Sequence, residues 1–135
     1  MEDINNILKN AECEMKRLKH PYVGSEHLLL AILNSDDVIV KTLNSYNIYY
    51  DNFSKTLIEL VGCSKKENPY ILHTPLFKRI LDNANDLAIE RKEELNISHL
   101  LISLLEENDG IAIRVLVELD VDLDSLYNDI VKKLK

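Results

Sequence analysis

Apolar residues recur along the chain at helical spacing, in segments joined by short polar connections. In the first segment they stand three or four residues apart, on one face of a helix: Ile4, Ile7, Leu8, Ala11, Met15 and Leu18. A similar stripe follows in the second half: Ile80, Leu81, Ala84, Leu87 and Ala88. Two shorter runs, Leu28 to Leu33 and Leu100 to Leu105, are almost wholly apolar, which predicts helices buried on most sides.

Two further helices are expected in each half, over about 37–43 and 51–61, and over about 110–119 and 124–134. Each fourth helix opens at an aspartate, Asp51 or Asp124, which is suited to cap exposed backbone N–H groups. The pair Thr74-Pro75 predicts another helix start, with Thr74 as the N-cap and Pro75 at the first helical position.

The two halves repeat one another, which predicts paired supersecondary units. Four blocks keep their order and spacing: residues 7–11, 27–33, 38–43 and 48–53 correspond to 80–84, 99–105, 111–116 and 121–126. A four-helix unit of roughly 60 residues is marginal alone. We therefore expect an all-α fold of eight helices in one domain, residues 1–135. Its two four-helix repeats, 1–62 and 74–135, are joined by a linker at 63–73 and pack as a pseudo-twofold pair.

Composition narrows the function classes. Hydrophobic residues make up 46% of the chain, so a core can form without disulfides, and the three glycines and three prolines argue against a turn-rich β fold. A net charge of -7 argues against a nucleic-acid partner. No apolar run reaches the roughly 18 residues of a membrane span, and no signal-like segment opens the chain. We expect a cytoplasmic protein with reduced thiols at Cys13 and Cys63.

No catalytic or metal-binding constellation is evident, so we expect neither an enzyme nor a cofactor. The four histidines, His20, His27, His73 and His99, match no metal-ligand spacing and have no nucleophile partner in the pattern. His27 and His99 hold matched positions before the two apolar runs. We expect each of these two imidazoles to bond to the loop that precedes its helix.

Several segments carry a resemblance to a known family. Residues 17–30, Arg-Leu-Lys-His-Pro-Tyr-Val-Gly-Ser-Glu-His-Leu-Leu-Leu, resemble the Leu-Gly-His…Val-Gly-Thr-Glu-His-Leu-Leu-Leu signature of the Clp N-terminal domain. His73-Thr74-Pro75 with 78–81, Lys-Arg-Ile-Leu, is similar to the segment that opens that family's second repeat. Residues 110–116 and 121–123 resemble its third helix and the turn after it. The resemblance covers essentially the whole chain.

The resemblance implies a protein-binding role. In that family the domain sits at the N-terminus of hexameric AAA+ unfoldases, where it recruits substrates and adaptor proteins, and the ClpC type also recognises phosphorylated arginine. No phosphate-loop motif occurs here, so the ATPase motor is absent from this chain. The chain is then either the N domain of a longer unfoldase or a free-standing interaction protein with a different partner. In isolation it is expected to be a monomer.

Glu26 is the first candidate binding residue. Beside Gly24 and Ser25 at a helix start, its carboxylate can accept both N–H groups of a guanidinium, and the helix N-terminus suits a phosphate. One pocket would then recognise both parts of phosphoarginine. The alternative is a capping arrangement in which Ser25 caps the helix and Glu26 complements its dipole.

Two other places are weaker candidates. The second repeat has Asn96-Ile97-Ser98 where the family usually has Gly-Thr-Glu, after a shortened approach, so a second site at Ile97 and Ser98 would be degenerate. Three tyrosines cluster near the end of the first repeat: Tyr46, Tyr49 and Tyr50. They are a candidate partner surface because tyrosine is enriched at interfaces. The alternative is core packing of one ring with the others at the rim.

Overall fold

A computed structural model describes residues 4–63 and 71–134. Within these ranges the chain forms eight helices: α1 (Ile4–Leu18), α2 (Ser25–Leu33), α3 (Ile39–Ser45), α4 (Tyr50–Val61), α5 (Pro75–Glu90), α6 (Ile97–Glu107), α7 (Ile111–Glu118) and α8 (Leu123–Lys133). The β pairing within the described residues is a single parallel bridge between Val23 and His73. The expected all-α fold of eight helices is confirmed.

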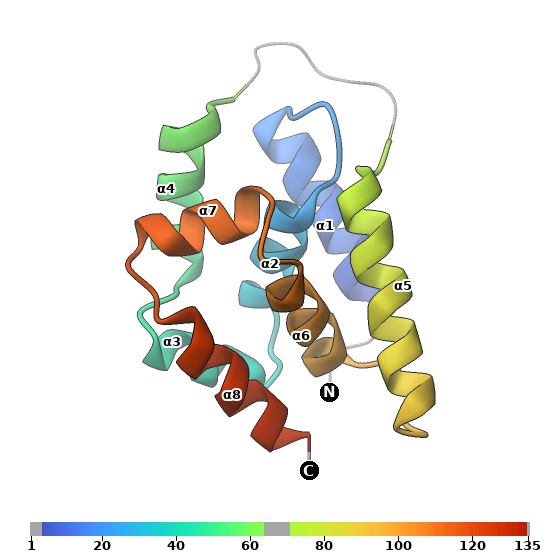
Figure 1. The fold of residues 1–135 in the computed structure, drawn as a ribbon. Coiled ribbons are helices and arrows are strands. Elements are labelled where there is room, and N and C mark those ends of the chain that lie inside the picture. The colour runs from blue at the N-terminus through green and yellow to red at the C-terminus, as the bar shows by residue number, and fades with distance from the viewer. Residues whose placement is uncertain (1–3, 64–70, 135) are drawn as a thin grey trace.

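The two nearly apolar runs form the centre of the molecule. Helix α2 contacts helices of both repeats and lies in the middle of the assembly, beside α6 (Figure 1). All nine residues of α2 are buried, and so are eight residues of α6. A helix satisfies its own backbone hydrogen bonds, so one with apolar side chains all round can be covered on every side. The runs at Leu28–Leu33 and Leu100–Leu105 therefore lie where their composition predicts.

Helices α1 and α5 each bury one stripe and expose the other side to solvent. The stripe of α1 is Ile7, Ala11, Met15 and Leu18, and that of α5 is Phe77, Ile80, Ala84 and Ala88. One buried position of α1 holds an acidic residue, Glu14. Its carboxylate accepts hydrogen bonds from Arg17 Nε at 2.9 Å and from the Tyr50 hydroxyl at 2.8 Å. These donors replace the water that this carboxylate loses.

The sequence predicted three helix caps, of which one is confirmed and two are wrong. Thr74 caps α5, since its side-chain oxygen accepts the Phe77 N–H at 3.0 Å, as predicted. The prediction that Asp51 and Asp124 are caps is wrong, because both lie in the first turn. Asp122 caps α8 instead. The two aspartates still favour their helices there through the dipole, which is why the sequence pattern resembles a cap.

Both repeats use the same backbone turns at equivalent places. Lys19 and Lys92 have φ of 57° and 58° and end α1 and α5, and Asn47 and Asp120 have φ of 63° and 62° before α4 and α8. The connection from Lys92 to the N-cap of α6, Asn96, is one residue shorter than that from Lys19 to the N-cap of α2, Gly24. The shortened approach in the second repeat is thus confirmed.

Hydrogen bonds tie the two repeats together at separate places. The Ala112 N–H at the start of α7 donates to Ser25 Oγ at 3.4 Å, and the Tyr46 hydroxyl donates to the Asp129 carboxylate on α8. The backbone around Val23 pairs with that of Leu72 and Thr74. Helices α4 and α7 also lie side by side (Figure 1). No helix in the described ranges has the length and apolar character to cross a bilayer.

Candidate functional site

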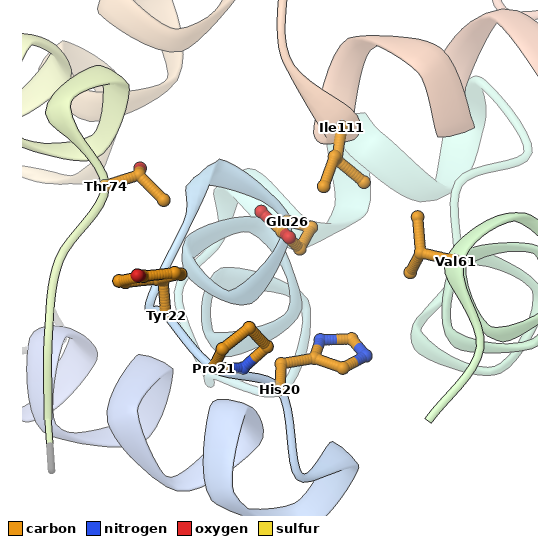
Figure 2. A pocket seen from close by; sticks show the side chains of 7 residues that line it. All are labelled: His20, Pro21, Tyr22, Glu26, Val61, Thr74 and Ile111. Carbon is orange, nitrogen blue, oxygen red and sulfur yellow. The ribbon is translucent and has the colours of Figure 1, made fainter. Parts of the chain in front are cut away.

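A cavity of about 180 Å³ lies where the first repeat meets the second, beside the start of α2. Its walls come from five parts of the chain: His20, Pro21, Tyr22, Glu26, Val61, Thr74 and Ile111. Figure 2 shows Glu26 near the centre, with Tyr22 and Thr74 on one side and Val61 on the other. Sites for whole small molecules usually begin near 300 Å³. This cavity suits the end group of one side chain.

Glu26 is the charged centre of the cavity. Only 6% of the residue is exposed, and no ion pair to its carboxylate is found within the described residues. Burial raises the pKa of Glu26 from 4.5 to about 7, against a smaller lowering by a hydrogen bond from its own backbone N–H. A buried carboxylate without a cation is costly. Such a group is poised to accept a cationic ligand.

Gly24 and Ser25 lie beside this carboxylate but are not among the residues that line the cavity. A Cβ on Gly24 would stand 2.2 Å from Glu26 Oε1, so only glycine leaves the carboxylate its place. Ser25 is buried, and its hydroxyl oxygen accepts the Ala112 N–H of α7. The N-cap of α2 is Gly24, so the expected cap at Ser25 is wrong. The other half of that alternative holds, because Glu26 lies in the first turn of α2, where a carboxylate complements the helix dipole.

Two histidines next to the cavity form a chain of hydrogen bonds, here called the His27 relay, that connects Gly24 to Gly62. The Gly24 N–H donates to His27 Nδ1 at 2.9 Å, which places the imidazole hydrogen on Nε2. That hydrogen points to His20 Nδ1 at 2.8 Å, and His20 Nε2–H then donates to the Gly62 carbonyl at 2.8 Å. Burial, and then the charges of His20 and Arg17, lower the pKa of His27 to about 3. The His27 imidazole is therefore neutral, as its acceptance of the Gly24 N–H requires.

The second repeat has an equivalent chain of hydrogen bonds, in which His99 takes the place of His27 and the acidic residue Glu93 takes the place of His20. The Asn96 N–H donates to His99 Nδ1 at 3.0 Å, and His99 Nε2 lies 3.1 Å from Glu93 Oε1. Arg91 bonds to Glu93 at 2.7 Å and donates to the Leu134 carbonyl at 2.8 Å. Hydrogen bonds from Arg91 and then His99 lower the pKa of Glu93. The prediction that both matched histidines bond to the preceding loop is confirmed.

His20, Glu26 and His27 are also grouped as metal ligands are, with one donor atom of each within 4.8 Å of the others. The hydrogen bonds argue against a metal site in which all three residues are ligands. His27 Nδ1 accepts the Gly24 N–H, so Nε2 carries the hydrogen and has no lone pair for a metal. His20 and Glu26 alone fall short of the three or four protein ligands typical of zinc. The arrangement favours a structural chain of hydrogen bonds.

The other sequence candidates do not join this site. Ser98 takes the place of Glu26 at the start of α6, where its N–H donates to Asn96 Oδ1 at 2.9 Å, and Ile97 is buried. The second repeat therefore has no carboxylate at this position. Tyr50 and Tyr46 are half-buried and bonded to carboxylates, which leaves Tyr49 as the exposed one of the three tyrosines.

Sequence reasoning missed most of the walls of the cavity. Val61 and Ile111 read as ordinary helix residues, and Thr74 was predicted only as a cap. No local pattern links them to Glu26, because they come from separate helices brought together by packing.

Comparison with known proteins agrees with this arrangement. A profile described as the Clp repeat (R) N-terminal domain matches residues 2–95 and 72–135. The ATP-binding subunit ClpC of the ATP-dependent Clp protease from Staphylococcus epidermidis is 31% identical over 137 aligned residues, which cover 98% of this chain. ClpC from Staphylococcus aureus is similar to the same extent. The chain spans only 16% of the length of these relatives.

Solved structures give the same fold. The N-terminal domain of the chaperone ClpD from Arabidopsis thaliana has a TM-score of 0.80 at 20% identity, with 100% of this chain and 96% of that chain covered. The Hsp104 N-terminal domain from Candida albicans has a TM-score of 0.78 at 15% identity, with 97% and 88% covered. Profile, sequence and fold agree: the chain belongs to the Clp repeat N-terminal domain family.

Proposed function

We propose that this domain binds substrate proteins or adaptor proteins for a Clp-type AAA+ unfoldase, and that the cavity at Glu26 recognises phosphorylated arginine. The observation that carries this proposal is a buried carboxylate with no ion pair within the described residues, set in a cavity bounded by three helix N-termini. Phosphoarginine has a guanidinium for the carboxylate and a phosphoryl group for the helix ends.

The carboxylate supports the cationic half of the ligand. A guanidinium presents two parallel N–H groups to a carboxylate, and such bidentate bonds strengthen when both partners leave water. Glu26 already bears the cost of burial, and a bound guanidinium would offset that cost. The apolar walls at Val61 and Ile111 would pack on the methylene part of the arginine side chain.

The helix ends support the anionic half. Glu26 lies in the first turn of α2, Thr74 caps α5, and Ile111 is the first residue of α7, and all three line the cavity. Each helix N-terminus carries about half a positive charge, which attracts phosphate.

The Phe77 and Ala112 N–H groups at these ends are already bonded to Thr74 and Ser25, so the attraction would come from the helix dipoles and the remaining N–H groups. No lysine or arginine is among the described residues that line the cavity. The phosphoryl group would therefore rely on backbone N–H groups and the Thr74 hydroxyl.

One site per chain is expected. Ser98 replaces the carboxylate in the second repeat, and its N–H is already bonded to the Asn96 side chain. The test is a calorimetric titration of the protein with phosphoarginine, with arginine and inorganic phosphate as separate controls. We expect saturable binding near one ligand per chain and at least tenfold weaker binding of either half alone. An absence of heat, and of amide NMR shifts at millimolar phosphoarginine, would remove this mechanism and leave adaptor docking.

The affinity for phosphoarginine is expected to rise with pH. Only the ionised form of Glu26 pairs with a guanidinium, and its pKa lies at about 7. About a tenth of the carboxyl is ionised one unit below this pKa and about nine tenths one unit above it, so the association constant should rise roughly tenfold from pH 6 to pH 8. Calorimetry across this range measures the rise, and phosphorus NMR of the ligand alone corrects for its own titration. A constant affinity would contradict a role for Glu26 as the cation partner.

A further inference from the structure

We propose that Arg114 binds the phosphoryl group of the ligand and thereby makes the Glu26 cavity prefer phosphorylated over unmodified arginine. This inference rests on the proposed function and assigns the anionic half of the ligand to a side chain. The two halves of phosphoarginine would then have one charged partner each, Glu26 for the guanidinium and Arg114 for the phosphoryl group.

A second cavity lies beside the Glu26 cavity, along the same two helices. It has a volume of about 280 Å³, and its walls include Leu60, Gly110 and Arg114. Val61 and Ile111, which line the Glu26 cavity, directly follow Leu60 and Gly110 in the chain. The two cavities therefore adjoin at the end of α4 and the start of α7, which lie side by side in Figure 1.

The start of α7 is packed against the starts of α2 and α5. A Cβ added to Gly110 would stand 2.4 Å from Leu76 Cδ2 of α5 and 3.2 Å from Ser25 Oγ of α2. The three helix ends that wall the Glu26 cavity are therefore in direct contact with one another. A residue one turn along α7 begins from a fixed position close to this cavity.

The guanidinium of Arg114 is within reach of the opening of the Glu26 cavity. Arg114 lies three residues after Ile111, which is about 4.5 Å along the helix axis and on the same side of α7. Helical side chains lean towards the N-terminus of their helix, and an extended arginine side chain is longer than this rise. The guanidinium can therefore extend past Ile111 to a phosphoryl group at the start of α7.

No strong interaction holds Arg114 elsewhere. It is exposed, and no ion pair to it is found within the described residues. Asp109 and Glu118 line the second cavity with it, but both are exposed, and Asp109 accepts the Gly110 N–H at 2.8 Å. The other three arginines each bond to a glutamate: Arg17, Arg79 and Arg91. Arg114 is thus the arginine that can turn to a ligand without breaking an ion pair.

The charge of Arg114 separates the two forms of the ligand. A phosphoryl group can accept two N–H groups of a guanidinium in charge-assisted hydrogen bonds. Unmodified arginine has no such group and brings a second positive charge towards Arg114, which repels it. Arg114 therefore favours phosphoarginine and gives no advantage to arginine.

Arg114→Gln tests this inference in calorimetric titrations with phosphoarginine and with arginine. We expect the affinity for phosphoarginine to fall about tenfold and the affinity for arginine to change less than twofold. Arg114→Lys keeps the charge but loses the planar pair of donors, so it should lose only about threefold. Urea denaturation should give the same midpoint for all three proteins, because Arg114 is exposed and has no ion pair within the described residues.

Lys41→Gln is the matched control. It removes the same charge from an exposed position on α3, and none of the described residues that line the Glu26 cavity belongs to α3. Its affinity for phosphoarginine should stay within twofold of the wild type, and an equal loss in both glutamine variants would overturn the inference in favour of long-range attraction.

Three further outcomes would also count against the inference. An equal fall for arginine and phosphoarginine in Arg114→Gln would assign Arg114 a structural role and overturn it. Unchanged binding of phosphoarginine by Arg114→Gln would overturn it and leave the proposed function standing. Absence of phosphoarginine binding by the wild type would overturn both.

Discussion

Glu26→Gln is expected to bind phosphoarginine at least a hundredfold more weakly than the wild type and, at pH 8, to resist unfolding better. The amide keeps the shape of the side chain but loses the charge that a guanidinium needs. In the folded protein the pKa of Glu26 lies at about 7, above 4.5, so ionisation of this carboxyl opposes folding. That opposition is about 1 kcal/mol at pH 5, grows between the unfolded pKa of 4.5 and the folded pKa of about 7, and levels off at about 3 kcal/mol above pH 7.

Urea denaturation at pH 5 and pH 8 measures the stability change, and calorimetry measures binding. The expected gain in unfolding free energy of Glu26→Gln is largest at pH 8 and fades towards pH 5. Glu14→Gln is the matched control, because Glu14 is equally buried but bonded to Arg17 and Tyr50. It should lose about 1–2 kcal/mol of stability and keep its affinity. A Glu26→Gln variant that loses stability at pH 8 would indicate a structural carboxylate.

His27→Ala is expected to lower the free energy of unfolding by about 3 kcal/mol and to weaken phosphoarginine binding at least tenfold. The imidazole is fully buried and accepts the Gly24 N–H, so alanine leaves a cavity and an unpaired buried donor. It also releases His20, which lines the pocket, from one of its two hydrogen bonds. Gly24 and His20 are then less firmly held around Glu26.

His99→Ala is the control that separates a general loss of stability from a local loss of phosphoarginine binding. His99 is equally buried and accepts the Asn96 N–H in the same way, so its loss should cost a similar amount of stability. Its relay runs through Glu93 and does not reach the Glu26 cavity, so binding should change less than twofold. Urea denaturation and calorimetry of both variants provide the comparison. Equal losses of affinity in both would mean that binding responds to global stability and that the His27 relay has no local role.

Much of the fold could be predicted from local patterns. Apolar spacing located the stripes of α1 and α5, and the two apolar runs identified the buried helices α2 and α6. These features depend on residues within a few turns of each other, where helical periodicity acts directly. The caps at Asp51 and Asp124 were misplaced, because an aspartate favours the cap and the first turn alike.

The site was only partly predictable. The signature around Glu26 identified the carboxylate, and the repeat correspondence identified the missing carboxylate at Ser98. The sequence could not show that Glu26 is buried without an ion pair, since that depends on which side chains other helices bring to it. The sequence suggested that Ser25 is the N-cap of its helix, whereas the Ser25 hydroxyl accepts a hydrogen bond from the Ala112 N–H of the other repeat.

The amino-acid sequence by itself determined the helices, their pairing into repeats and the residue that would carry the charge. Short-range hydrogen bonding and apolar periodicity suffice for these features. The packing of the two repeats decided the cavity, its three helix ends and its apolar walls, because Val61, Thr74 and Ile111 meet Glu26 only in the folded chain. It also raised the pKa of Glu26, since that shift arises from the water that packing excludes from the carboxylate.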